Sequence, residues 1–134
     1  MVNPKKQIAI VDDEADLTYL FCEALSSVGL NGIGFDDPLI ALEYIREHSS
    51  DIGMVITDWK MPKMSGFELI RNIDEMDQDI KIVLMSAYEL EEDQLKEVNK
   101  DDYLKKPIHM SKLIETVKKE LTQTPYLKQD KILR

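Results

Sequence analysis

Apolar positions in this chain follow two patterns, short unbroken runs and stripes with helical spacing. The clearest runs, all rich in β-branched side chains, occupy residues 8–11, 54–56 and 80–85, the last of them interrupted once by Lys81. Runs of this length that end at polar residues predict strands buried on both faces, which are typical of parallel sheets. Two shorter runs, one around Ile33 and one over 102–105, predict two more strands. Gly32 and Gly34 weaken the first of these, because glycine is a poor strand former.

The stripes predict amphipathic helices between the strands. The first stripe comprises Leu17, Leu20, Phe21, Ala24, Leu25 and Val28. Gly29 is well placed to end that helix. Asp37 and Pro38 are residue types that cap and begin a second helix. Its apolar residues are Ala41, Leu42 and Ile45.

Three more helices are predicted in the second half of the chain. Ser65 and Glu68 have the spacing of a capping box, which starts a helix with an apolar core face. Residues 89–99 predict a polar helix with few apolar anchors, supported by Glu92 and Lys96 at four positions' separation. A closing amphipathic helix follows Pro107. Its apolar residues are Met110, Leu113, Ile114, Val117 and Leu121.

Strands and helices therefore alternate five times along the chain. This order predicts an α/β fold with right-handed βαβ crossovers and a parallel sheet covered on both faces. The length of 134 residues predicts one domain, over residues 5–121. Residues 122–134 are expected to form a tail that frays or docks on a partner, because they are too few to fold as an output domain.

Composition narrows the function classes. The net charge of −9 argues against a nucleic-acid-binding surface, which needs clustered Lys and Arg. The single cysteine, Cys22, excludes an internal disulfide and a cysteine-based metal cluster. No apolar run approaches the roughly 20 residues that span a bilayer, and the first residues lack a signal-peptide pattern. We therefore expect a cytoplasmic protein without membrane insertion.

The candidate chemistry gathers where the predicted strands end. Asp12 and Asp13 follow the first strand, Asp58 ends the third, Ser86 ends the fourth, and Lys106 follows the fifth. Parallel strands place these ends at one edge of the sheet, which is where open α/β sheets bind ligands. Crowded carboxylates require a cation, and oxygen ligands favour Mg²⁺ or Mn²⁺ over Zn²⁺. A lysine and a hydroxyl beside them would grip the oxygens of a phosphoryl group.

Each of these residues also has an ordinary structural explanation. Asp58 could cap a turn, Asp13 or Glu14 could cap the next helix, Ser86 could be a turn residue, and Lys106 a solvated charge. Five such residues at the ends of four strands favour a joint functional site, because the residue types and their predicted positions in the fold point to the same place.

The ordered motifs resemble the receiver domain of two-component response regulators. The matching segments are Val11-Asp12-Asp13-Glu14, the run from Asp58 through Met61-Pro62 to Ser65-Gly66, Met85-Ser86-Ala87, and Tyr103-Leu104-Lys105-Lys106-Pro107. The resemblance covers residues 5–121. It implies a flavodoxin-like (βα)5 three-layer sandwich with a parallel five-stranded sheet in the order 2-1-3-4-5, which binds ligands between its first and third strands.

The resemblance also implies a role for each acidic residue. Asp58 would accept a phosphoryl group from a phosphohistidine on a sensor kinase or a phosphotransfer protein. Asp13 and Asp58 would bind Mg²⁺ directly, Asp12 would bind it through water, and the backbone carbonyl of Lys60 would add an oxygen. Such a protein is not an enzyme in the ordinary sense, since it catalyses only its own phosphorylation and dephosphorylation.

The remaining family positions imply a readout. Lys106 and the amide of Ala87 would contact the phosphoryl oxygens, and Ser86 would move to hydrogen-bond them. Tyr103 would then turn inward and alter the face formed by the fourth helix, fifth strand and fifth helix, on which a downstream target docks. Tyr103 could instead be an ordinary half-buried strand residue.

The sequence departs from the family pattern at two places. Asn99-Lys100 stands where small residues are usual, which puts a positive charge near the output face. Lys60 and Tyr88, each two residues after a motif residue, are both large and would shield the acyl phosphate from water. We therefore expect slow self-dephosphorylation.

Three other function classes compete with a phosphoacceptor. A flavin-binding electron carrier would need a phosphate loop after the first strand, where this chain has acids that repel phosphate. An aspartyl phosphatase would need a second Asp where Lys60 stands. A degenerate receiver that acts as an unphosphorylated interaction module is the most serious rival, although it would usually have lost Asp58, Lys106 or an acidic partner.

Overall fold

The computed structural model describes residues 6–77 and 79–122, which form a five-stranded parallel sheet between two layers of helices. The sheet order is β2-β1-β3-β4-β5. The strands are β1 Gln7–Val11, β2 Asn31–Phe35, β3 Ile52–Asp58, β4 Lys81–Ser86 and β5 Asp102–Lys105. Both the flavodoxin-like class and the strand order are confirmed. The prediction that residues 123–134 fray or dock falls outside the described residues.

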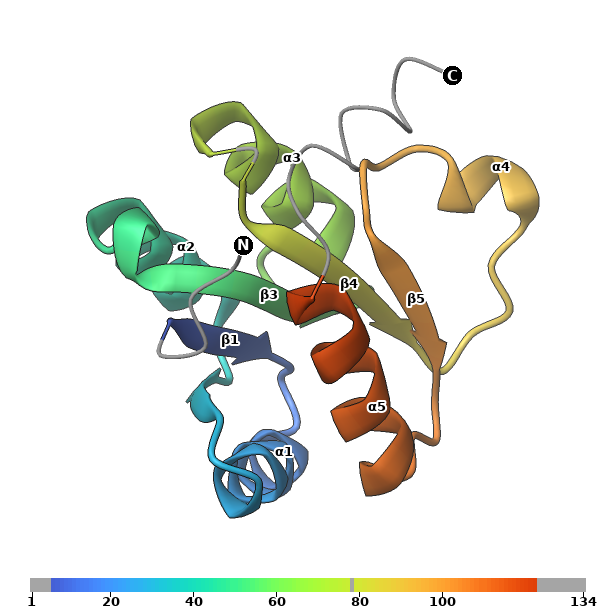
Figure 1. Cartoon of the computed structure of the whole chain (residues 1–134). Coiled ribbons are helices and arrows are strands. Elements are labelled where there is room, and N and C mark those ends of the chain that lie inside the picture. Colours follow the sequence, from blue (N-terminus) through green and yellow to red (C-terminus); the bar gives the residue numbers. More distant parts are fainter. Residues whose placement is uncertain (1–5, 78, 123–134) are drawn as a thin grey trace.

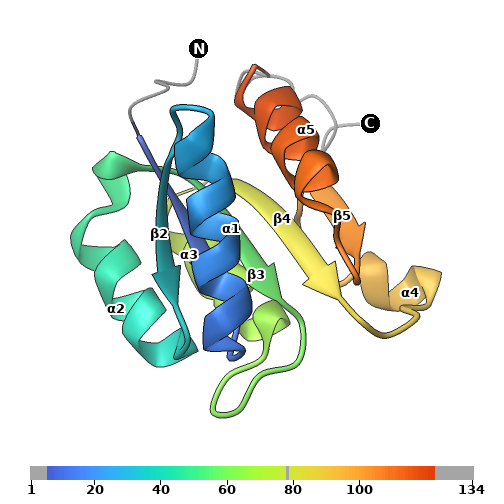
Figure 2. The same ribbon diagram turned by 90° about the horizontal axis from the view of Figure 1, so that it is seen from below.

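The helices lie on the two faces of the sheet. The helix bounds are α1 Ala15–Ser27, α2 Pro38–Glu47, α3 Gly66–Met76, α4 Glu92–Leu95 and α5 Met110–Leu121, with a short 3-10 turn at Ser49–Asp51. Helices α1 and α5 pack side by side on one face, and α2 and α3 pack together on the other (Figures 1 and 2). None of the helices in the described ranges has the length and apolar character to cross a membrane.

The core explains why the unbroken apolar runs form the central strands. All seven residues of β3 and all six of β4 are buried, and β3 lies between β1 and β4. One cluster of apolar side chains fills the α2–α3 side and a second fills the α1–α5 side. A strand that faces apolar layers on both sides needs continuous apolar residues, which is the pattern that the sequence shows.

Three predicted helix boundaries have the expected local contacts. The Asp37 carboxylate accepts a hydrogen bond from the Leu39 amide at 2.9 Å, with Pro38 in the first turn of α2. The Ser65 hydroxyl accepts one from the Glu68 amide at 3.2 Å at the start of α3. Gly29 follows α1 with a φ of +81°, a left-handed conformation that glycine adopts without strain.

The predicted helix over 89–99 is wrong in extent, because only Glu92–Leu95 is helical. The segment contributes one buried apolar side chain, Val98, which is too little packing to hold three turns. Polar contacts fix it instead. Arg71 of α3 pairs with Glu97 at 3.2 Å, and the ammonium of Lys100 donates to the Leu95 carbonyl. Lys100 therefore caps this segment and is half-buried, rather than a free positive charge on the surface.

The apolar face of α1 is narrower than its stripe predicts. Phe21 and Leu25 are buried, but Leu20 is 51% and Val28 39% exposed. The helix lies close against β2, where a Cβ on Gly34 would approach the Thr18 methyl group to 2.3 Å. This close approach turns the Thr18 side of α1 inward and leaves the Leu20 side in solvent.

A candidate acidic site at the carboxyl edge of the sheet

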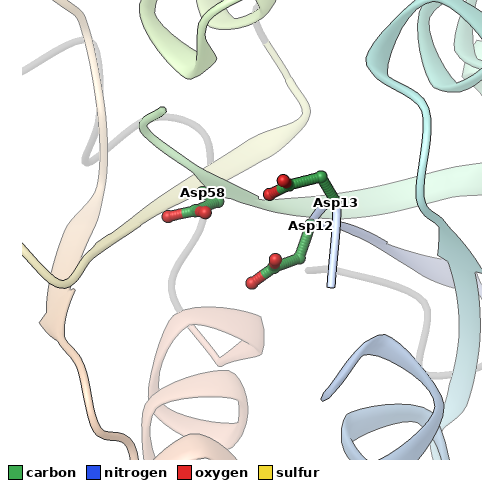
Figure 3. Close-up of side chains that lie close together, drawn as sticks. All are labelled: Asp12, Asp13 and Asp58. Atoms are coloured by element: carbon green, nitrogen blue, oxygen red, sulfur yellow. The ribbon is translucent and has the colours of Figure 1, made fainter. Parts of the chain in front are cut away.

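Three carboxylates meet at the carboxyl ends of β1 and β3. Asp12 and Asp13 follow β1 directly, and Asp58 is the last residue of β3. Because β1 and β3 are neighbours, one carboxylate oxygen from each residue lies within 4.8 Å of the others (Figure 3). Asp12 and Asp58 are buried, whereas Asp13 is exposed. The site therefore has two buried acids and one that faces solvent.

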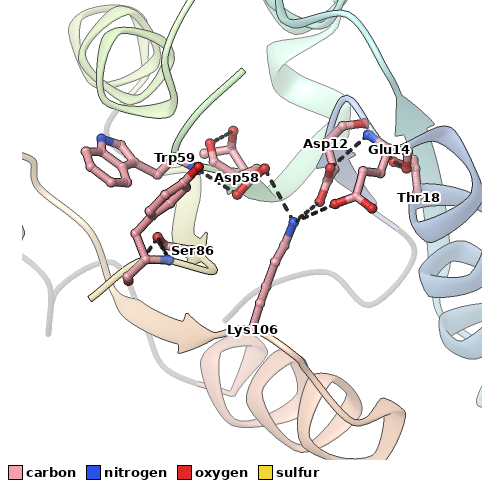
Figure 4. Close-up of polar contacts among 9 residues, drawn as sticks. Asp12, Glu14, Thr18, Asp58, Trp59, Ser86 and Lys106 are labelled. Carbon is pink, nitrogen blue, oxygen red and sulfur yellow. Dashed lines mark hydrogen bonds and ion pairs between the residues drawn. The ribbon is translucent and has the colours of Figure 1, made fainter. Parts of the chain in front are cut away.

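Lys106 brings the counter-charge from beyond β5. Its ammonium lies 2.6 Å from Asp12 Oδ2, 3.3 Å from Asp58 Oδ2 and 3.7 Å from Glu14 Oε1 (Figure 4). Burial alone would lower the pKa of Lys106, but the hydrogen bonds and charges of Asp12 and Asp58 outweigh burial and raise it. Lys106 is therefore a fixed cation that links two of the three acids.

The Asp58 carboxyl is the most perturbed acid of the site. Its pKa is raised to about 6, first by burial and then by repulsion from Asp12, although Lys106 and the Trp59 amide act in the opposite direction. A single lysine therefore does not neutralise this cluster. Near pH 7 Asp58 is mostly ionised, and its charge lacks full compensation.

This donor set fits a small divalent cation. The three side chains offer only carboxylate oxygens, and Asp13 is open to solvent, so a hard cation could keep several waters. An added positive charge would relieve the repulsion that raises the Asp58 pKa. That the Lys60 backbone carbonyl is a further metal ligand stays a prediction from the sequence.

Two residues that the sequence analysis did not assign to the site shape the turn after β1. The Asp12 carboxylate accepts a hydrogen bond from the Glu14 amide at 2.9 Å, and the Thr18 hydroxyl donates to the Asp12 carbonyl at 3.0 Å. Neither Asp13 nor Glu14 caps α1 through its side chain; Glu14 is the cap residue and makes no such bond. The signal for Thr18 was a polar residue among the apolar positions of α1.

The loop after β3 folds back onto the end of that strand. The Gly66 amide donates to the Trp59 carbonyl at 2.6 Å, and a Cβ on Gly66 would lie 2.1 Å from the Asp58 carbonyl oxygen. No other residue type fits there without moving this loop. The Trp59 amide donates to Asp58 Oδ1 at 3.0 Å, which orients the carboxylate.

Ser86 points away from the acids in this structure. Its buried hydroxyl accepts a hydrogen bond from the Tyr88 amide at 2.9 Å and donates to the Tyr88 carbonyl at 3.2 Å. The Tyr103 hydroxyl donates to the same carbonyl at 3.4 Å. The Tyr88 backbone therefore connects two residues that sequence reasoning placed in the readout. Ala87 lies between Ser86 and Tyr88 in the chain and is exposed.

Lys60 and Tyr88 lie next to each other and both contact Trp59, the residue after Asp58. The Lys60 ammonium sits 5.0 Å from the centre of the Trp59 ring and 4.8 Å from the centre of the Tyr88 ring. The two rings meet edge to face at 5.6 Å. Both distances to Lys60 are within the range of a cation–π contact. The three side chains form one cluster, called here the aromatic–lysine cluster.

Comparison with known proteins identifies this arrangement. The family model described as response regulator receiver domain matches residues 8–118. Sporulation initiation phosphotransferase F of Bacillus subtilis is 31% identical over 90% of this chain and 96% of its own length. The phosphate regulon transcriptional regulatory protein PhoB of Pseudomonas aeruginosa is 32% identical over 89% of this chain. The chain spans about half the length of PhoB, 53%.

A solved structure agrees in fold and in sequence. The response regulator protein TrrA of Thermotoga maritima, in complex with Mg²⁺ and a beryllium fluoride, has a TM-score of 0.74 and 32% identity. The match covers 85% of this chain and 97% of the other. The similarity therefore extends over almost the whole of the compact fold.

Proposed function

The chain belongs to the family of response regulator receiver domains, and from this we propose that it is a phosphoacceptor in which Asp58 takes a phosphoryl group from a phosphohistidine. The observation that carries the proposal is the meeting of Asp58 with Asp12, Asp13 and Lys106 at one edge of the sheet. A strand-end carboxylate with a fixed lysine and two further acids has the parts that phosphoryl transfer to an aspartate requires.

The transfer step follows from the position of these groups. An ionised Asp58 oxygen attacks phosphorus, the bond between phosphorus and the histidine nitrogen breaks, and the electron pair of that bond returns to the imidazole. Lys106 lies 3.3 Å from the attacking carboxylate and is placed to pair with phosphoryl oxygens, as is the Ala87 amide in this proposal. Such a loose transition state needs positioning and charge neutralisation more than covalent help.

Asp12, Asp13 and Asp58 are the residues proposed to hold Mg²⁺, together with the Lys60 carbonyl. The bound ion would supply positive charge at the phosphoryl oxygens. The proposal is supported by the donor set and by the similar TrrA, whose structure contains Mg²⁺. Mn²⁺ would satisfy the same oxygen ligands.

The readout is proposed to run through the Tyr88 backbone. If Ser86 turns toward a phosphoryl group on Asp58, the Tyr88 amide and carbonyl lose their bonds to the Ser86 hydroxyl. Tyr103 donates to the same carbonyl, so its position becomes free to change as well. The surface formed by α4, β5 and α5 would then differ between the two states and would dock a downstream protein.

Proposed partners follow from the family. The phosphodonor would be a sensor histidine kinase or a phosphotransfer protein, in a cytoplasmic two-component relay. The name of the Bacillus subtilis relative describes a phosphotransferase in sporulation. By analogy we propose that this chain passes its signal through protein docking. Its catalysis would be limited to its own phosphorylation and dephosphorylation.

Acetyl phosphate and beryllofluoride test the proposal. With Mg²⁺, acetyl phosphate should add one phosphoryl group to the wild-type chain by intact mass and none to Asp58→Asn. Trp59 adjoins Asp58 and is the single tryptophan of the chain, so its fluorescence should respond to Mg²⁺ and to beryllofluoride. A flat fluorescence signal with both reagents, together with no acyl phosphate, would favour the unphosphorylated interaction module.

A further inference from the structure

A groove separate from the acidic site runs along the free edge of the sheet. Strand β2 is the edge strand and pairs with β1 on one side; within the described residues no strand pairs with its other side. Helix α1 lies on one face of β2 and α2 on the other (Figure 2). Between them is a cavity of about 570 Å³. Its lining residues come from α1, from β2, from the loop that leads into α2 and from the first turn of α2.

The groove is apolar on both sides of the strand edge. Tyr19 and Cys22 line it from α1, and Ile40 lines it from α2. Tyr19 is 64% and Ile40 57% exposed, so both offer apolar surface to the groove that they line. A chain laid beside β2 would point alternate side chains toward Tyr19 and toward Ile40, because strand residues alternate between faces. Both faces of an added strand would therefore find apolar surface.

The rim of the groove is acidic. The lining includes two carboxylates, Asp36 and Asp37, and no lysine or arginine. Asp37 is already paired with Lys63 at 2.6 Å, whereas Asp36 is exposed. Asp16 and Glu23 stand three residues before and four after Tyr19, so they flank it on the same face of α1. The whole of α1 contains no basic residue.

We propose that this groove binds an extended segment of a partner protein as a sixth strand beside β2, with adjacent apolar residues flanked by lysine or arginine. The free edge of β2 offers backbone groups for pairing, which is the basis of strand addition. The acidic rim selects the flanking charges and disfavours a second copy of this chain, whose net charge is −9. This function would be independent of the phosphoacceptor function proposed for Asp58.

A short labelled peptide tests the proposal with the intact protein. The probe is fluorescein-Lys-Val-Ile-Val-Lys-amide, measured by fluorescence anisotropy. Saturable binding is expected, with a dissociation constant below about 1 mM. A peptide with Glu in place of both Lys should bind at least about tenfold more weakly. A peptide with alternate backbone amides N-methylated should lose binding, because it cannot pair with the strand edge.

Variants of the protein locate the binding. Ile40→Lys and Tyr19→Ala should each weaken binding about tenfold or more, and circular dichroism should show that both fold. Leu20→Ala is the matched control, because Leu20 is exposed at 51% on α1 but does not line the groove. Equal binding of the N-methylated peptide, or weakening by Leu20→Ala but not Ile40→Lys, would overturn the proposal. So would failure to bind combined with a concentration-dependent dimer that Ile40→Lys abolishes, which would make a second copy the occupant.

Discussion

Burial and the Asp12 charge favour the neutral form of Asp58, although its carboxyl is mostly ionised near pH 7. Its folded pKa of about 6 lies above the value near 3.9 of an unfolded aspartate. Between these two pH values the folded chain binds more protons than the unfolded one, so its stability falls as pH rises through about 6. The ionised Asp58 carboxylate therefore lowers the stability of the metal-free protein at neutral pH.

Asp58→Asn should accordingly stabilise the metal-free protein at pH 7.5 by on the order of 2 kcal/mol. The gain should shrink toward zero below about pH 3, where the wild-type carboxyl is protonated in both states. Urea denaturation at several pH values with a chelator present measures this. A gain that does not depend on pH would mean that packing, rather than charge, distinguishes the two side chains.

The aromatic–lysine cluster of Trp59, Lys60 and Tyr88 begins at the residue that follows Asp58 in the chain. If it excludes water from an acyl phosphate, Lys60→Ala with Tyr88→Ala should shorten the phosphorylated half-life about threefold or more. Decay of the acyl phosphate after removal of acetyl phosphate gives the half-life, and Tyr19→Ala, which removes an exposed ring on α1 outside the aromatic–lysine cluster, is the control. A half-life that is unchanged or longer in the double variant would contradict the shielding role.

The charged residues of the site could be predicted, because acids at the ends of apolar runs are visible in the sequence. The contacts that support these residues could not be predicted. Asp12, Asp58 and Lys106 each interrupt or follow an apolar run. Thr18 supports Asp12 through a hydrogen bond to its carbonyl, and nothing in the spacing of residues marks that contact. The orientation of Ser86 toward Tyr88 also depends on side-chain rotation, which local sequence does not determine.

At the scale of the element, α5 contains a buried acid. Glu120 is 2% exposed, and its Oε1 has no hydrogen-bond partner among the described residues. Burial raises its pKa first, and Asp102 and Asp101 add to the increase, while Lys119 acts against it. A raised pKa means that the stability contribution of Glu120 is lost as pH rises through that value.

Glu120→Gln should therefore stabilise the protein at pH 8, by about 1 kcal/mol, because the amide keeps the shape of the side chain without its charge. The gain should be absent near pH 4. Thermal unfolding at both pH values measures it, with the exposed Glu115→Gln of the same helix as the control. A loss of stability at pH 8 would show that the contact of Glu120 with Lys119, 3.6 Å in this structure, outweighs the cost of burial.

Elements could be predicted where packing and sequence pattern agree. Helix α3 has a capping serine and four buried apolar side chains, and it forms as expected. The polar residues around α4 favour a helix but give it no apolar face, and only four residues are helical. The segment after α4 is held by an ion pair between Glu97 and Arg71 of α3, a tertiary contact that no local pattern marks. The extent of α4 is thus decided by packing.

At the scale of the whole molecule, the segment over 87–101 follows Ser86 directly and includes α4, which is part of the proposed docking face. A phosphoryl mimic that draws Ser86 toward Asp58 would break the hydrogen bond of the Tyr88 amide. With Mg²⁺ and beryllofluoride, that amide should exchange its hydrogen about fivefold faster or more. Amides of the buried strand β3 should be unchanged. Equal exchange at Tyr88 with and without the mimic would exclude this route.

Lys106 contacts Asp12, 94 positions earlier in the chain, and also Asp58, so both carboxylates acquire this cation only after the last strand is in place. During synthesis, β1 to β4 could emerge from the ribosome and fold with Asp58 present but with Lys106 still missing. Such an unfinished chain would be a poor phosphoacceptor. If Asp58 is the phosphoacceptor, as proposed, only a completely folded chain has the whole site.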